Sequence, residues 1–115
     1  MRAVKLITAI VRAGKLEEVT RAVVNAGARG MTATEVRGFG QQYGHVPEAY
    51  PAERPALLLP KLRVDVVVQD QEAAAVADAI AKSVRSGAIG DGKIWVCPVD
   101  AAVRVRTDER DRDAV

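Results

Sequence analysis

The apolar residues of this chain change their spacing in a fixed order, from strand-like to helix-like and back. Residues 4–11 are apolar and rich in β-branched side chains, which is typical of a buried strand. Residues 16–26 carry apolar side chains at helical spacing, and Gly27 follows as a stop signal. Residues 32–36 again have strand composition. The first part of the chain therefore predicts strand, helix, strand.

The second part of the chain repeats this order. Residues 62–69 alternate between apolar and polar side chains, with one interruption, as a half-buried strand does. An amphipathic helix follows, which Asp70 can cap and Gly87 can end. Residues 93–96 and 101–105 are predicted to be the closing strand segments.

Two strand–helix–strand units in tandem predict one α+β domain over residues 1–115. The order is that of a ferredoxin-like split βαβ fold, an antiparallel sheet with two helices on one face. Apolar residues make up 49% of the chain but aromatics only 3%, so we expect an aliphatic core. The other face of so valine-rich a sheet is expected to be covered by another subunit.

Composition excludes several classes of function. The 17 basic and 15 acidic residues leave a net charge of +2, too balanced for non-specific nucleic-acid binding. One cysteine allows no internal disulfide, and no apolar run approaches the roughly 20 residues of a membrane span. We therefore expect a cytoplasmic protein without direct nucleic-acid binding or membrane insertion. Residues 107–115, dense in both charges, are predicted to be a solvated tail.

One long segment, residues 40–60, does not fit a compact domain. It shows neither helical nor strand spacing and contains four prolines, Pro47, Pro51, Pro55 and Pro60. Loops longer than about 12–15 residues without secondary structure are uncommon and usually functional or disordered. We interpret it as a mobile arm that contacts a partner; a tolerated insertion is the alternative.

A glycine-rich turn at residues 90–93 is the clearest ligand signal. Glycines let backbone N–H groups close on an anion, and Lys93 adds positive charge. Arg104, in the predicted strand 101–105, and Arg106, just after it, stand at i and i+2 and would share one face if the strand continues, where two like charges favour an anion between them. Phosphate suits the arginine fork. The alternative is an ordinary turn and a solvent-exposed basic stripe.

A second group of candidate residues flanks the long loop. Gly38-Phe39-Gly40 opens the loop and permits close approach of the backbone to a ligand. Gln42 is a plausible single ligand for a nucleotide-bound Mg²⁺. Lys61, just after the loop, could hold a carboxylate or a phosphate; the alternative is an ordinary lysine at a strand start.

Together these motifs resemble the PII signal-transduction family, the nitrogen regulatory proteins. The matching segments occur in the family's order and spacing and span nearly the whole chain. They are Gly30-Met31-Thr32, Thr34-Glu35-Val36, Gly38-Phe39-Gly40, Gln42, Gly44-His45, Leu59-Pro60-Lys61, Gly90-Asp91-Gly92-Lys93-Ile94, Pro98-Val99 and Arg104-Val105-Arg106-Thr107.

The resemblance implies a homotrimer with three clefts between subunits, in which ATP and ADP compete. It implies that 2-oxoglutarate binds through Mg²⁺ held by ATP and Gln42, with Lys61 pairing its carboxylate. Thr32 and the backbone near Val67 would face the adenine. The nucleotide-binding residues by motif position are Thr32, Gly38, Gly40, Gln41, Gln42, Val67, Gly90, Asp91, Gly92, Lys93, Arg104 and Arg106.

The long loop corresponds to the family's T-loop, which docks onto targets such as ammonium channels and enzymes. Here the sequence departs from the family pattern. The positions that relatives modify covalently are Arg54 and Ala52, which predicts no modification there. Gln41 and Tyr43 replace two basic residues, which could weaken nucleotide binding. The predicted partner-contacting residues of the loop are Tyr43, Tyr50, Arg54, Leu57 and Leu58.

These features indicate a non-enzymatic regulator whose target is a membrane channel, a transporter or a metabolic enzyme. One alternative is a PII-like regulator of bicarbonate or other anion transport that responds to ADP or AMP. The changed loop favours this alternative, whereas Gln42 and Lys61 oppose it. A second alternative is a slow ATPase, although no residue makes a convincing general base beside a phosphate.

Overall fold

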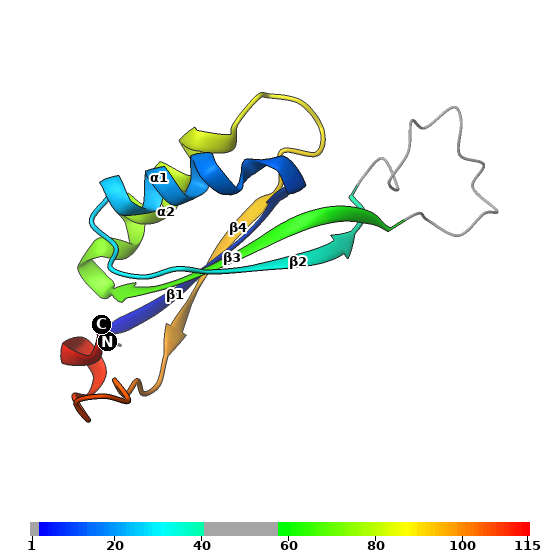
Figure 1. The fold of residues 1–115 in the computed structure, drawn as a ribbon. Helices are drawn as coiled ribbons and strands as arrows, with labels where there is room; N and C mark the ends of the chain where they lie inside the picture. The colour runs from blue at the N-terminus through cyan, green and yellow to red at the C-terminus, as the bar shows by residue number, and fades with distance from the viewer. Residues whose placement is uncertain (1–2, 41–57) are drawn as a thin grey trace.

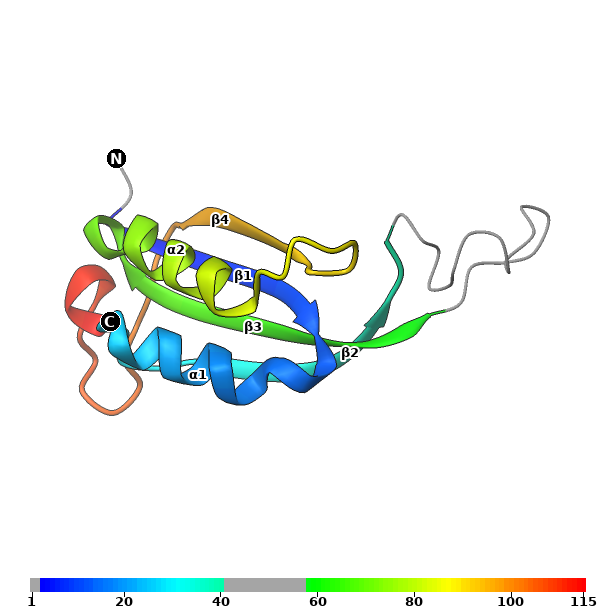
Figure 2. The same cartoon turned by 90° about the horizontal axis from the view of Figure 1, so that it is seen from above.

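Four antiparallel strands form a sheet in the order β2–β3–β1–β4 within the computed structural model, which describes residues 3–40 and 58–115 (Figure 1). Two helices complete the predicted pattern. The strands are β1 Val4–Arg12, β2 Thr32–Gly38, β3 Leu59–Gln69 and β4 Lys93–Val99; the helices are α1 Leu16–Asn25 and α2 Ala73–Val84. Both helices lie side by side on one face of the sheet (Figures 1 and 2). This confirms the predicted α+β, ferredoxin-like fold.

The core lies between the helices and the sheet and is aliphatic, as expected. Every second residue of β3 faces the helices, and Val19 and Ile80 close the core from α1 and α2 with no exposed surface. The buried hydrophobic cluster comprises Ile7, Ala9, Val11, Val19, Val23, Leu62, Val64, Val66, Val68, Ala73, Val76, Ile80 and Val84.

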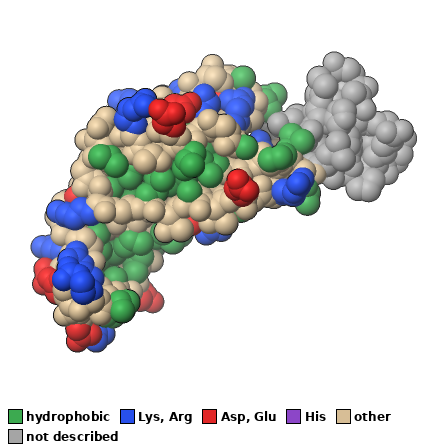
Figure 3. Space-filling model, viewed as in Figure 1, with side chains coloured by type: hydrophobic (Ala, Val, Ile, Leu, Met, Phe, Trp, Pro, Cys, Tyr) green, Lys and Arg blue, Asp and Glu red, His purple; other side chains and the backbone are tan. Residues whose placement is uncertain are grey.

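The face of the sheet opposite the helices is partly apolar. Strand register places Leu6 of β1 between Val67 of β3 and Cys97 of β4 on this face. Val67, the residue that interrupts the alternation of β3, is 42% exposed on this face, and Trp95 is 40% exposed. In Figure 3, which views the sheet from its β2 edge, some hydrophobic side chains lie on the side of β2 away from the helices, toward the C-terminal residues. This surface, the open face, is suited to packing against another subunit.

The start of α2 differs from the prediction. A 3-10 turn, Asp70–Glu72, precedes the helix, and the Glu72 carboxylate accepts the backbone N–H of Gln69 at 3.2 Å. Asp70 is therefore not the capping residue; its carboxylate lies 3.6 Å from the Lys5 ammonium group instead.

The predicted strand at residues 101–105 is wrong. The chain turns back on itself here, with a single bridge between Val103 and Arg110. The N–H of Arg104 donates to the Glu109 carbonyl at 2.9 Å, and Asp108 adopts a left-handed backbone at φ 61° to close the turn. The alternating valines and arginines mimic a strand, but Val105 is 96% exposed and pairs with no strand of the described residues. A 3-10 turn, Asp111–Ala114, follows.

Candidate functional site

The loop between α2 and β4 is closed by glycines that no other residue can replace without strain. Gly90 and Gly92 have φ angles of 102° and 113°, in the region that favours glycine. A Cβ atom on Gly92 would lie 2.0 Å from the carbonyl oxygen of Ile10, so the loop backbone meets the end of β1 directly. The glycine-rich turn is therefore fixed against the sheet.

Asp91 holds the same loop together from within. Its carboxylate accepts the backbone N–H groups of Ser86 and Gly87 at 2.8 Å each, and the Ser86 hydroxyl at 2.5 Å. The Arg12 guanidinium lies 2.5 Å from the same carboxylate. The hydrogen bonds from Ser86, then that from Gly87 and the contact with Arg12, hold the pKa of Asp91 far below its ordinary value. Asp91 is therefore an ionised anchor of the loop.

Arg12 also anchors this loop, and the sequence analysis did not identify it. From the end of β1 it donates to the Ile89 carbonyl at 3.0 Å and to the Ser86 hydroxyl at 3.3 Å, in addition to Asp91. One side chain thus joins the first strand to a loop almost eighty residues later in the sequence. A lone basic residue at a strand end was the only signal in the sequence, and it does not reveal this partner.

A cavity of about 440 Å³, here called the lysine cavity, lies beside this loop. The end of β2, the start of β3 and the glycine-rich loop surround it, and Figure 2 shows the end of β2 and the loop after α2 at the same end of the sheet. Lys61 and Lys93 supply its positive charge. Its predicted site residues are Gly38, Gly40, Lys61, Gly90, Asp91, Gly92 and Lys93.

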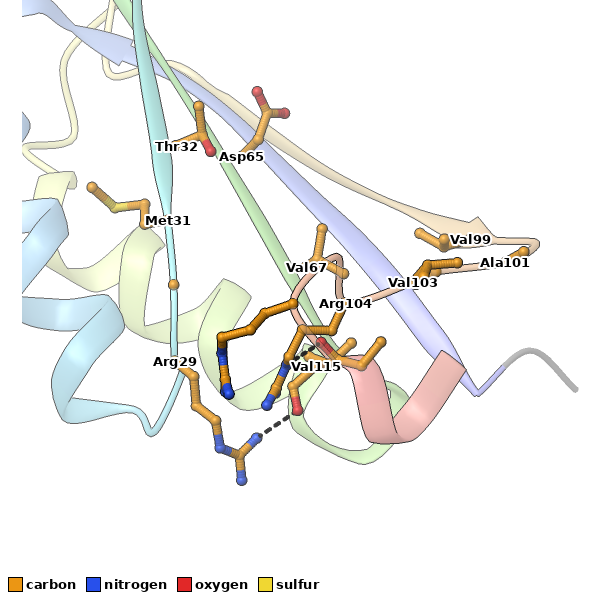
Figure 4. Close-up of a pocket in the computed structure, with 14 residues that line it drawn as sticks. Arg29, Met31, Thr32, Asp65, Val67, Val99, Ala101, Val103, Arg104 and Val115 are labelled. Atoms are coloured by element: carbon orange, nitrogen blue, oxygen red, sulfur yellow. Dashed lines mark hydrogen bonds between the residues drawn. The ribbon is translucent and has the colours of Figure 1, made fainter. Parts of the chain in front are cut away.

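A second cavity, of about 730 Å³, is here called the arginine cavity (Figure 4). It lies between the start of β2, the middle of β3 and the C-terminal residues, and it holds the predicted residues Thr32, Val67, Arg104 and Arg106. Arg104 and Arg106 thus share a cavity although the strand expected to present them does not form. Arg29 lines the cavity as well and was not predicted.

Among the residues that the structure describes, one side-chain carboxylate lines the arginine cavity, and it already accepts hydrogen bonds from other side chains. Asp65 accepts the hydroxyl of the buried Thr8 at 2.8 Å and the Nε–H of Arg63 at 3.1 Å. The arginines of the cavity therefore meet little negative charge from Asp65. Such a cavity is suited to an anionic ligand.

The two cavities lie at opposite ends of the strands. Gly38 pairs with Leu59 and Ile10 with Lys93 at the lysine cavity, whereas Thr32 pairs with Asp65 near the arginine cavity. Within one chain, those predicted nucleotide-binding residues that the structure describes are therefore divided into two groups that do not meet.

Part of the predicted site lies outside the described residues. Gln41 and Gln42 lie in the part that is not described, and Gln42 is the predicted Mg²⁺ ligand. The same holds for the predicted partner-contacting residues Tyr43, Tyr50, Arg54 and Leu57 and for the modification position Ala52. Leu58 is described: it is 53% exposed, and its carbonyl accepts a hydrogen bond from Arg37 at 3.5 Å.

The fold and the two cation-lined cavities define a ferredoxin-like domain suited to anionic ligands. The family profile described as "Nitrogen regulatory protein P-II" matches residues 4–109. The chain belongs to this P-II family, whose members are signal-transduction regulators that form oligomers, typically trimers.

Individual relatives cover almost the whole chain. It is 45% identical to the nitrogen regulatory protein P-II of Synechocystis over 96% of this chain and 99% of the relative. It is 41% identical to the nitrogen regulatory protein GlnK of Escherichia coli K12 over the same shares. The crystal structure of Arabidopsis thaliana PII bound to citrate superposes with a TM-score of 0.79 at 32% identity, covering 99% of this chain and 94% of that one. The predicted family resemblance is thus confirmed.

No helix in residues 3–40 and 58–115 combines the length and the apolar character needed to cross a membrane.

Proposed function

We propose that this chain is a non-enzymatic cytoplasmic regulator that binds ATP and ADP in clefts between the subunits of a homotrimer. Ligand binding would control a target protein through the loop at residues 40–60. The observation that carries the proposal is the division of the site: lysines and glycines at one end of the sheet, arginines at the other. Each chain offers two half-sites, and a neighbour could complete each of them.

The open face supports assembly of such half-sites. Leu6, Val67, Trp95 and Cys97 would leave water if neighbouring sheets packed together, and burying apolar area stabilises association. A cyclic trimer uses one head-to-tail interface three times, so each interface would join the arginine cavity of one chain to the lysine cavity of the next.

The charges of the two cavities support a nucleotide polyphosphate as the ligand. Lys93 and the N–H groups of the glycine-rich loop would contact phosphates from one side, and Arg104 and Arg106 from the other. Thr32 and Val67 lie on neighbouring strands of the arginine cavity, where Thr32 and the backbone near Val67 could face a base. Cationic side chains and N–H groups would thus meet the phosphates, and the two strands would meet the base.

A second effector is part of the proposal. Lys61 lines the lysine cavity, where its ammonium group could pair with the carboxylate of 2-oxoglutarate. Gln42 would supply an oxygen ligand to a nucleotide-bound Mg²⁺, a cation that prefers such ligands and keeps several waters. This favours 2-oxoglutarate over bicarbonate as the second effector.

The state of Asp91 supports a binding protein over an ATPase. Asp91 is the carboxylate that lines the lysine cavity among the described residues, and its low pKa and engaged oxygens make it a poor general base. Hydrolysis at a typical enzymatic rate of about 1–10³ per second would contradict the non-enzymatic proposal.

Titration calorimetry with ATP and ADP tests the proposal, with Lys93→Gln and Arg104→Gln as the variants. Each should weaken binding by about 10- to 150-fold, since a charge-assisted hydrogen bond contributes about 1.5–3 kcal/mol. Lys82→Gln is the matched control, because Lys82 is exposed on α2 and pairs with Asp78. Absence of binding at millimolar nucleotide would refute the proposal. Binding of 2-oxoglutarate without Mg-ATP would contradict the role given to Gln42.

A further inference from the structure

The arginine cavity contains a third arginine beyond the two that the sequence analysis selected. Arg29 lies in the turn between α1 and β2 and lines the cavity together with Arg104 and Arg106. Figure 4 shows Arg29 and Arg104 on the same side of the cavity, next to Val115. Three arginines therefore line one cavity.

These guanidinium groups have little compensation from acidic side chains. Arg104 lies 3.5 Å from the Glu109 carboxylate, which also accepts the Thr107 hydroxyl at 2.6 Å. Over residues 3–40 and 58–115, no side-chain carboxylate forms an ion pair with Arg29 or Arg106. One such partner for three like charges leaves them to repel one another, and an anion between them would relieve the repulsion.

Two of the three arginines donate hydrogen bonds to backbone oxygens of the C-terminal residues. Arg29 Nη1 donates to the backbone oxygen of Val115, and Arg104 Nε to that of Ala114, both at 3.4 Å. Arginine–phosphate hydrogen bonds are usually shorter, about 2.7–2.9 Å, and stronger. A phosphate oxygen could therefore replace these long contacts with a net gain.

We propose that Arg29 is a third anion-binding residue of the arginine cavity, and that it favours ligands with more phosphate charge. The backbone oxygens of Ala114 and Val115 hold Arg29 and Arg104 in place until the anion enters. The inference rests on the proposed function, because it takes a nucleotide as the ligand of this cavity. It adds a residue and a selectivity to that function.

Calorimetry with ATP, ADP and AMP, at low and at high salt, tests this role with Arg29→Gln and Arg29→Lys. Arg29→Gln should weaken ATP binding by about tenfold or more and AMP binding by much less, because AMP carries fewer phosphates. Its ATP affinity should also depend less on salt. Arg29→Lys should recover part of the loss, since it keeps the charge but not the fork.

Arg21→Gln is the matched control, because it removes the same charge from an exposed α1 position where Arg21 pairs with Glu17 at 2.7 Å. If wild type binds ATP and Arg29→Gln matches this control within about twofold, Arg29 has no role and the proposed function stands. Equal losses for ATP and AMP would overturn the selectivity and with it the inference. A wild-type protein that binds no nucleotide would refute the proposed function itself.

Discussion

Replacing Gly92 by alanine should damage both the fold and the lysine cavity. The added Cβ would lie 2.0 Å from the Ile10 carbonyl oxygen and 3.1 Å from the Val11 Cα atom. These atoms belong to the backbone of β1, so no flexible side chain can move away to make room. The start of β4 must separate from β1 at the Ile10–Lys93 pair, or the loop must change its course.

The expected magnitude has two sources. An L-residue held at φ 113° costs about 1–3 kcal/mol, and forcing a methyl group into a filled space costs about 1–3 kcal/mol more. The Gly92→Ala protein should thus lose about 2–6 kcal/mol of unfolding free energy, which lowers the melting temperature by on the order of 10 °C or more. Nucleotide binding, measured well below the melting temperature, should also fall because Lys93 moves with the loop.

Two glycine controls separate these sources in thermal unfolding at one fixed protein concentration. Gly14→Ala has no atom within 4 Å of the new Cβ and no positive φ, so it should be nearly neutral. Gly87→Ala also meets no atom, but its φ of 86° isolates the backbone contribution. The reasoning is refuted if Gly92→Ala melts within about 2 °C of Gly14→Ala.

Three further changes test the loop anchor and the core. Asp91→Asn should lower the melting temperature at pH 7 but not in strong acid. The pKa of Asp91 is lower in the folded protein than its ordinary value near 3.8, so the stability it contributes is fully present above pH 3.8 and is lost as the pH falls through the folded-state pKa. A difference in melting temperature that stays constant with pH would contradict this. Arg12→Gln should speed hydrogen exchange at the Ser86 amide, and unchanged exchange would show that Arg12 does not secure the loop. Ile80→Ala should cost about 2–5 kcal/mol in denaturant unfolding, whereas Val24→Ala, at an exposed site of α1, should cost less than about 0.5; equal costs would argue against the described core.

The order of strands and helices could be predicted because residue spacing encodes it. Period-two and helical patterns located β1, α1, β3 and α2 to within a few residues, and Val67 was correctly marked as an exception within its strand. Spacing does not encode which strand, if any, will pair with a segment. Residues 101–105 therefore looked like a strand, although the chain folds back on itself there.

The candidate site was predictable only in its parts. Glycine, lysine and arginine motifs identified residues of both cavities, because their chemistry is local. That the motifs lie at opposite ends of one sheet depends on strand register, which single motifs do not contain. Arg12 and Arg29 were missed for the same reason: their roles arise from approach to Asp91 and to the C-terminal residues, both distant in sequence.

Mixing two defective variants tests most directly the claim that each site is shared between subunits. Lys93→Gln damages the lysine cavity, and Arg104→Gln damages the arginine cavity. In a trimer containing both kinds of chain, one interface joins the intact arginine cavity of one chain to the intact lysine cavity of the next. After unfolding and refolding together in equal amounts, with mixed trimers verified by native mass spectrometry, about a quarter of the sites should bind ATP with wild-type affinity. Mixed trimers that show no wild-type site would contradict the shared cleft.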